Sequence, residues 1–230
     1  MVSSNILQRT FLVRVGAASG TAFTIDIDGR QYKVTAEHVI RGLVAGTDLL
    51  IRHANDWKKC PVGNVWSASG GTDVAVVSPK KQLSPALEIG VTGSDGFFVS
   101  EEVFFLGFPY GYFTEAGQAN NDYPIPFVKR GIISGFTKAS NGHQVIFVDG
   151  HNNRGFSGGP VVTTTATKQH NVIGVVFGFQ SVPEPVLFGG QPTGLTYDYN
   201  SGLVVVHNIR PALDYIRQNP FGAQITTRPA

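Results

Sequence analysis

Apolar and polar residues alternate along short stretches of this chain, and glycine, proline or asparagine separates one stretch from the next. Residues 11–15 and 21–27 alternate in this way, and the second stretch runs into Asp28-Gly29, a dipeptide typical of hairpin turns. Because a period of two residues is the signature of a half-buried β-strand, the pattern predicts an all-β fold. The expected strands of the first half are 11–15, 21–27, 31–35, 48–52, 60–66 and 73–77.

A second set of alternating stretches begins after residue 100. Its expected strands are 101–106, 127–136, 144–149, 160–165, 172–179 and 202–206. Segments 113–126 and 182–200 carry glycine, proline and asparagine without periodicity, and we expect both to be long loops. One helix is expected near the end, because Asn208 can cap it, Pro211 suits its first turn and Asn219-Pro220 stops it.

Two groups of about six strands favour two six-stranded antiparallel β-barrels followed by a C-terminal helix. We expect a single domain over residues 1–230. Within it, the N-terminal barrel would span about 8–92, the C-terminal barrel about 98–207, and the helix about 208–219.

Composition supports a globular protein and excludes several kinds of partner. Hydrophobic residues make up 42% and charged residues 15%, with a formal net charge of +2, which does not indicate a nucleic acid or an acidic membrane surface. Cys60 is the only cysteine, so neither an intrachain disulfide nor a thiolate metal cluster can form. The chain starts at Met1 and shows no signal peptide or membrane span, so we expect a cytoplasmic protein.

The stretch 153–162 places Ser157 among glycines immediately before a β-branched run. Glycine tolerates positive φ and leaves space for a second backbone, so this turn can direct the N–H groups of Gly155 and Ser157 towards one point. That point is where the oxyanion of an acyl-transfer intermediate needs donors. A serine hydroxyl also needs an adjacent base, and the base needs an orienting acid. His38 at the end of one strand and Asp73 at the head of another are the candidates.

Three segments together resemble the signatures of trypsin-like serine peptidases, with the HtrA/DegP-type protease domain as the nearest pattern. The segments are Thr35-Ala36-Glu37-His38-Val39, Asp73-Val74-Ala75-Val76 and Gly155-Phe156-Ser157-Gly158-Gly159-Pro160, in the family's order of His, Asp and Ser. Residues 103–109 and 131–135 are similar to the segments that open the family's second barrel. The likeness extends from about residue 16 to about residue 216.

The resemblance implies a serine endopeptidase that acts on protein or peptide substrates and needs no metal or other cofactor. Ser157 matches the nucleophile, His38 the general base, and Asp73 the carboxylate that orients it, while the amides of Gly155 and Ser157 match the oxyanion hole. The strand that pairs with bound substrate corresponds to Val175, Val176, Phe177 and Gly178, and the pocket floor lies near His151.

Two departures from the family matter for regulation. Phe156 stands where digestive relatives carry the aspartate that captures a new N-terminus, so that activation route should be absent. The chain also leaves no space for the PDZ domain of many HtrA proteins, so any regulation should come from another protein.

The same residues admit two other interpretations. The order Ser157, Asp198, His207 would suit an α/β-hydrolase, but that fold needs a helix directly after the serine, and a β-branched run follows here. A trypsin-like scaffold that binds a partner or is activated by one stays open as an alternative. The histidines other than His38 are expected at the surface, and no pair of them has the spacing of a metal site: His53, His143, His151, His170 and His207.

Overall fold

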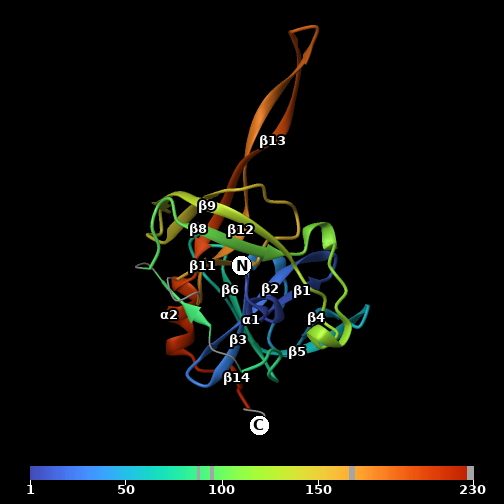
Figure 1. Cartoon of the computed structure of the whole chain (residues 1–230), viewed down its shortest axis with the longest axis vertical. Coiled ribbons are helices and arrows are strands. Elements are labelled where there is room, and N and C mark those ends of the chain that lie inside the picture. Colours follow the sequence, from blue (N-terminus) through green and yellow to red (C-terminus); the bar gives the residue numbers. More distant parts are fainter. Residues whose placement is uncertain (87–88, 94–95, 166–168, 227–230) are drawn as a thin grey trace.

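The computed structural model describes residues 1–86, 89–93, 96–165 and 169–226. Residues 87 and 88, which belong to the range expected for the first barrel, lie outside these ranges. Within the described residues the strands form two antiparallel-dominated sheets, each of seven strands. Figure 1 shows the two sheets stacked into one body, with a long strand pair projecting from one end. The expected all-β architecture is confirmed.

The first sheet closes on itself as the sequence pattern predicts. Its strands are β1 (Thr10–Val15), β2 (Ala18–Ile27), β3 (Arg30–Thr35), β4 (Asp48–His53), β5 (Asp56–Ser67), β6 (Ala75–Pro79) and β14 (Ala223–Gln224). Their order is β14-β3-β2-β1-β4-β5-β6, and an additional pairing between β3 and β6 closes a ring of six strands, with β14 outside it. In a closed ring each of these six strands pairs with a neighbour on both sides, so none of them is an edge strand.

The second sheet closes in the same manner. Its strands are β7 (Gly90–Val91), β8 (Glu102–Gly107), β9 (Phe127–Lys138), β10 (Gln144–Asp149), β11 (Pro160–Thr164), β12 (His170–Phe188) and β13 (Gln191–Asn208). The order is β11-β8-β9-β10-β13-β12-β7, and pairing of β11 with β12 closes the ring of six, leaving β7 outside. Leu106, Val162 and Val175 of this barrel belong to the same buried cluster as the core of the first, so the barrels share an apolar interface.

The segment 182–200, expected to be a loop, is instead the distal part of a β-hairpin formed by β12 and β13 (Figure 1). Val182 pairs with Tyr199 and Glu184 with Tyr197, and Gly189 and Gly190, both with positive φ, make the turn. The prolines misled the sequence analysis, since proline is tolerated in a strand where its missing N–H faces away from the partner strand. Large apolar side chains remain exposed along this arm: Val182, Leu187, Phe188, Leu195, Tyr197 and Tyr199.

The expected C-terminal helix is present as α2 (Arg210–Gln218), with Pro211 in its first turn. It packs Ala212, Leu213 and Ile216 onto the shared core. A further short helix that the sequence analysis did not expect, α1 (Ser4–Gln8), buries Ile6. Five residues lie below the length at which helical periodicity can be recognised in a sequence. No helix in the described ranges is long and apolar enough to cross a membrane.

Candidate active site

The pairing that closes the first barrel also brings His38 and Asp73 together. Thr35, the last residue of β3, pairs with Ala75, the first residue of β6. Continuing this antiparallel register past both strand ends sets the 3-10 turn η1 (Glu37–Val39) against Asp73. Asp73 accepts a hydrogen bond from the His38 backbone N–H on Oδ1 at 2.9 Å, and its Oδ2 lies 2.6 Å from His38 Nδ1.

Both oxygens of Asp73 therefore hold the same histidine. The Asp73 side chain is 9% exposed, whereas that of His38 is 35% exposed. A buried carboxylate is costly unless hydrogen bonds satisfy it, and here the backbone and the imidazole of one residue do so. A proton held on Nδ1 by Asp73 leaves Nε2 of the neutral ring as an acceptor on the exposed side.

Ser157 lies on the turn that precedes β11, and residues of the first barrel fix this turn. Thr21 of β2 donates its backbone N–H to the Ser157 carbonyl at 2.9 Å and its hydroxyl to the Gly155 carbonyl at 2.7 Å. Gly158 has φ +83°, and a Cβ there would lie 2.1 Å from the Thr21 carbonyl oxygen. Only glycine therefore allows the serine turn to approach the first barrel this closely.

Hydrogen bonds to the Arg154 and Phe156 carbonyls fix the two peptide groups that carry the N–H groups of Gly155 and Ser157. The Arg154 carbonyl accepts a hydrogen bond from Tyr110 N–H at 2.7 Å, and the Phe156 carbonyl accepts one from Gly159 N–H at 2.8 Å. In a planar trans peptide the N–H points opposite to the C=O, so Gly155 N–H and Ser157 N–H face the other side. Neither N–H has a hydrogen-bond partner among the described residues.

The Ser157 hydroxyl and the His38 ring both contact Phe177 of β12. Ser157 Oγ donates to the Phe177 carbonyl at 3.0 Å, and the Phe177 ring lies edge-on to His38 with centroids 5.9 Å apart. The described residues show no hydrogen bond between Ser157 and His38. The Phe177 ring also contacts His207, with centroids 5.4 Å apart.

The residues predicted to bind substrate divide into two groups. Val175 and Val176 are fully buried, and both backbone polar groups of Val176 are bonded to Gly158 and Gly159. The side chains of Val175 and Val176 belong to the core, whereas Phe177 is 41% exposed and Gly178 is partly exposed. His151 is exposed and its carbonyl accepts a hydrogen bond from Lys129.

Two histidines differ from the prediction of a surface position. His170 and His207 are each 7% exposed. Nδ1 of His170 lies 3.2 Å from the Thr164 hydroxyl, and Nε2 of the same ring accepts the backbone N–H of Ser3. Burial lowers the pKa of His207, an effect that Asp73 offsets in part. His170 lies on β12 and His207 on β13. Strand register decides which side chains lie on the buried face of the sheet, so a single polar residue at such a position is buried as well.

Sequence reasoning missed the residues that position the serine turn: Thr21, Tyr110 and Lys129. Thr21 and Lys129 lie in alternating strands and Tyr110 in a loop, where nothing local distinguishes them from neighbours. Their contacts join segments 22 to 134 residues apart, as the bonds from Lys129 to His151 and from Thr21 to Gly155 show. Only the folded chain could reveal them.

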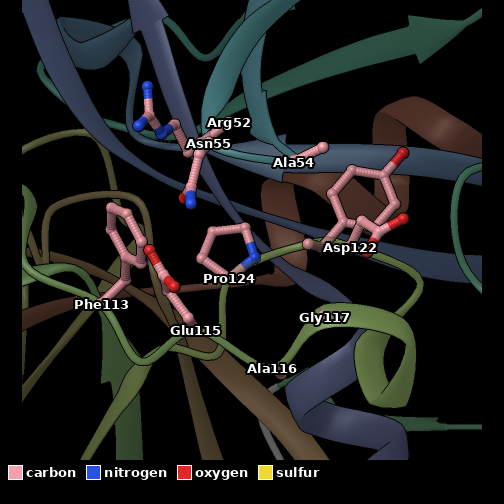
Figure 2. Close-up of a pocket in the computed structure, with 10 residues that line it drawn as sticks. Arg52, Ala54, Asn55, Phe113, Glu115, Ala116, Gly117, Asp122 and Pro124 are labelled. Atoms are coloured by element: carbon pink, nitrogen blue, oxygen red, sulfur yellow. The ribbon is translucent and has the colours of Figure 1, made fainter.

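Two surface pockets lie away from the catalytic candidates. One of about 120 Å³ is shown in Figure 2, where Asn55 points towards Pro124 and Phe113 between the β4–β5 turn and the loop 113–124. Its lining residues are Arg52, Ala54, Asn55, Phe113, Glu115, Ala116, Gly117, Asp122, Tyr123 and Pro124. None of them is a candidate for catalysis. In the described part of the chain, no group of three or more His, Cys, Asp or Glu side chains is arranged to hold a metal ion.

Comparison with known proteins agrees with this geometry. Residues 20–175 match the family model described as a trypsin-like peptidase domain. The fold is similar to that of HtrA-type protease AlgW with tripeptide, at a TM-score of 0.61 and 20% identity, over 95% of this chain. The chain spans 62% of the length of AlgW.

A second solved structure resembles the chain along most of its own length. It is a serine-to-alanine mutant of Rv3671c from M. tuberculosis H37Rv in an inactive form, with a TM-score of 0.59 and 17% identity. The match covers 94% of this chain and 90% of that one. At these identities the likeness shows the chymotrypsin-like fold. No protein with a curated description matches the sequence.

Proposed function

Because this chain belongs to the family of trypsin-like peptidase domains, we propose that it is a serine endopeptidase that cleaves protein or peptide substrates. The family match already gives the coarser conclusion of a protease. The proposal adds the nucleophile, the base and the reaction route. It requires no metal or organic cofactor.

The reaction begins with the Ser157 hydroxyl. Rotation about its Cα–Cβ bond moves Oγ away from the Phe177 carbonyl and towards Nε2 of His38, which takes the proton as Oγ attacks the substrate carbonyl. Asp73, held against Nδ1, stabilises the imidazolium that forms. The free N–H groups of Gly155 and Ser157 donate to the oxyanion of the tetrahedral intermediate.

Collapse of that intermediate releases the amine, which receives the proton from His38. An acyl-enzyme on Ser157 remains, and water, deprotonated by the same imidazole, attacks it. Cleavage of the acyl–Oγ bond returns that proton from His38 to Ser157 Oγ and releases the carboxylic acid product, which then ionises. The Phe177 carbonyl, freed when Oγ rotates before the attack, can accept a hydrogen bond from the substrate backbone from that point on.

The observation that supports the proposal best is the double contact between Asp73 and His38. A carboxylate that accepts both the backbone N–H and the Nδ1 proton of one half-exposed histidine fixes its tautomer and orientation. A structural histidine would not need its Nε2 left open beside a serine turn whose Gly155 and Ser157 N–H groups have no partner in the described part of the chain.

The direct test is labelling with an active-site fluorophosphonate, which reacts only with an activated serine. We expect wild-type protein to be labelled at Ser157 and Ser157→Ala to be unlabelled, with both proteins folded by circular dichroism. Casein or a peptide library should be cleaved by the wild type alone. Absence of labelling and cleavage in the isolated chain would contradict a constitutively active enzyme.

The alternative is a scaffold or an enzyme that a partner activates. It is favoured by one observation, the hydrogen bond from Ser157 Oγ to Phe177 rather than to His38. Labelling that appears only when a partner protein is added would support activation by the partner. Labelling by the isolated chain would exclude a scaffold.

A further inference from the structure

Lys129 contacts three points of the segment that carries the oxyanion donors. It lies on β9, and its Nζ donates to the His151 carbonyl at 2.5 Å and to Asn153 Oδ1 at 2.6 Å. The same ammonium lies 5.3 Å from the centroid of the Phe156 ring. One side chain therefore joins the residues that enter the turn to the residue that leaves it.

The turn between those contacts needs such support because its central residue is glycine. Gly155 has φ +102°, and the turn is closed by a hydrogen bond from Phe156 N–H to the Asn153 carbonyl at 3.3 Å. Glycine populates many backbone conformations at similar free energy, so Gly155 does not by itself prevent rotation of the Arg154–Gly155 peptide. The rotation is opposed from outside the turn, by the hydrogen bond from Tyr110 N–H to the Arg154 carbonyl at 2.7 Å and by the contacts of Lys129 with the flanking residues. Such a rotation would turn the Gly155 N–H away from the oxyanion.

In the described part of the chain, the charge of Lys129 interacts with this turn and not with a carboxylate. Among the described residues it forms no ion pair, whereas its neighbour Arg130 pairs with Glu102 at 3.3 Å. Lys129 lies opposite Phe105 on β8, and the Phe105 ring packs on Phe156 with centroids 5.4 Å apart. Burial lowers the pKa of Lys129, as expected for an ammonium partly removed from water.

We propose that Lys129 is a positioning residue that holds the turn 153–156 with the Gly155 N–H directed at the oxyanion. The Lys129 ammonium thus places a positive charge of this chain against the serine turn, next to Phe156, the residue before Ser157. The inference depends on the proposed function, because it assigns Lys129 to the oxyanion hole of the same site. Lys129 would not touch substrate.

The kinetic test uses Lys129→Met, which keeps the length of the side chain and removes its donors and charge. We expect kcat for a peptide substrate to fall about 10- to 100-fold with KM changed by less than about threefold, a smaller loss than the removal of a whole oxyanion donor. A peptide aldehyde, whose adduct places an oxyanion in the same hole, should bind more weakly by a similar factor. Lys81→Met, at an exposed lysine of the first barrel, should match the wild type.

Two further variants guard against a simple loss of folding. Asn153→Ala removes one acceptor and should reduce kcat less than Lys129→Met, while Lys129→Arg keeps the charge and should restore part of kcat. If Lys129→Met is folded and its kcat and aldehyde affinity equal those of Lys81→Met, the proposal is wrong. A rise in KM with unchanged kcat would also contradict it.

Hydrogen–deuterium exchange separates this inference from the proposed function. Amides of residues 150–158 should exchange faster in Lys129→Met than in wild type and Lys81→Met, whether or not the wild type cleaves peptides. If the wild type is inactive and these amides still exchange faster in Lys129→Met, the result supports the positioning role of Lys129 and rejects the peptidase assignment. Equal exchange of these amides in Lys129→Met and the wild type would overturn the positioning role of Lys129.

Discussion

The hydroxyl of Ser157 donates a hydrogen bond to the carbonyl of Phe177 at 3.0 Å, and the ring of Phe177 lies edge-on to His38. One residue of β12 thus contacts Ser157 through its backbone and His38 through its side chain. In the free protein the hydroxyl is held by a carbonyl that a substrate backbone could use instead. In the proposed mechanism, binding of substrate and release of the serine are therefore coupled through the same oxygen atom.

Replacing Ser157 by alanine tests the nucleophile. Because the hydroxyl makes one exposed hydrogen bond, its loss should change the free energy of unfolding by no more than about 1 kcal/mol. Turnover of a peptide substrate should fall by about 10⁶-fold, the loss found when a triad nucleophile is removed. Steady-state kinetics and thermal unfolding of the same preparations measure both effects. Residual turnover close to that of the wild type would assign the nucleophile elsewhere.

Replacing Asp73 by asparagine tests the orientation of His38. An amide at this position can donate to Nδ1, which favours the tautomer whose proton lies on Nε2 and cannot accept the serine proton. We expect kcat to fall by about 10⁴-fold with little change in KM. A loss below tenfold would mean that His38 is not the base.

Replacing Gly155 by alanine tests the oxyanion turn. The residue has φ +102°, and an added Cβ would lie 2.1 Å from the Phe108 carbonyl oxygen, so the turn must shift. Loss of one donor should reduce kcat by about 10²- to 10³-fold. Gly135→Ala is the control, because Gly135 does not require positive φ and its added Cβ would meet nothing within 4 Å. Equal kinetics for the two variants would contradict the assigned role of Gly155.

The buried His207 should make the fold sensitive to acid. Burial lowers its pKa below 6.5, so between the lowered pKa and about 6.5 the unfolded chain binds more protons than the folded one. The free energy of unfolding should therefore fall as pH drops through this window. Urea unfolding at pH 7.5 and pH 5.5 should show a smaller pH-dependent loss for His207→Gln than for wild type. The variant of exposed His151, His151→Gln, should retain the wild-type loss.

The projecting arm should be dispensable for folding. Residues 182–199 pair mainly with each other, and Ser181 and Asn200 are already register partners, so an Asn-Gly turn can join them. The shortened chain should keep its thermal midpoint to within about 3 °C, which corresponds to about 1 kcal/mol for a chain of this size. Scanning calorimetry measures the shift. A loss of cooperative unfolding would show that the arm stabilises the barrels.

The sequence alone determined the β-strands of both barrels, the C-terminal helix, and the three segments that contain His38, Asp73 and Ser157. These features are local: alternation reports a half-buried strand, and glycines around a serine report a turn that other residues cannot form. The prediction of a loop at 182–200 was wrong, because a segment rich in proline and glycine looks the same in sequence whether it forms a loop or an exposed hairpin.

Only the tertiary structure decided which distant groups meet. The closing pair β3–β6 places Asp73 against His38, Thr21 bonds the serine turn across the barrel interface, and Lys129 reaches the residues on either side of Gly155. These contacts depend on strand register and barrel closure, which side chains far apart in sequence fix jointly when they pack. No short segment of the chain contains that information.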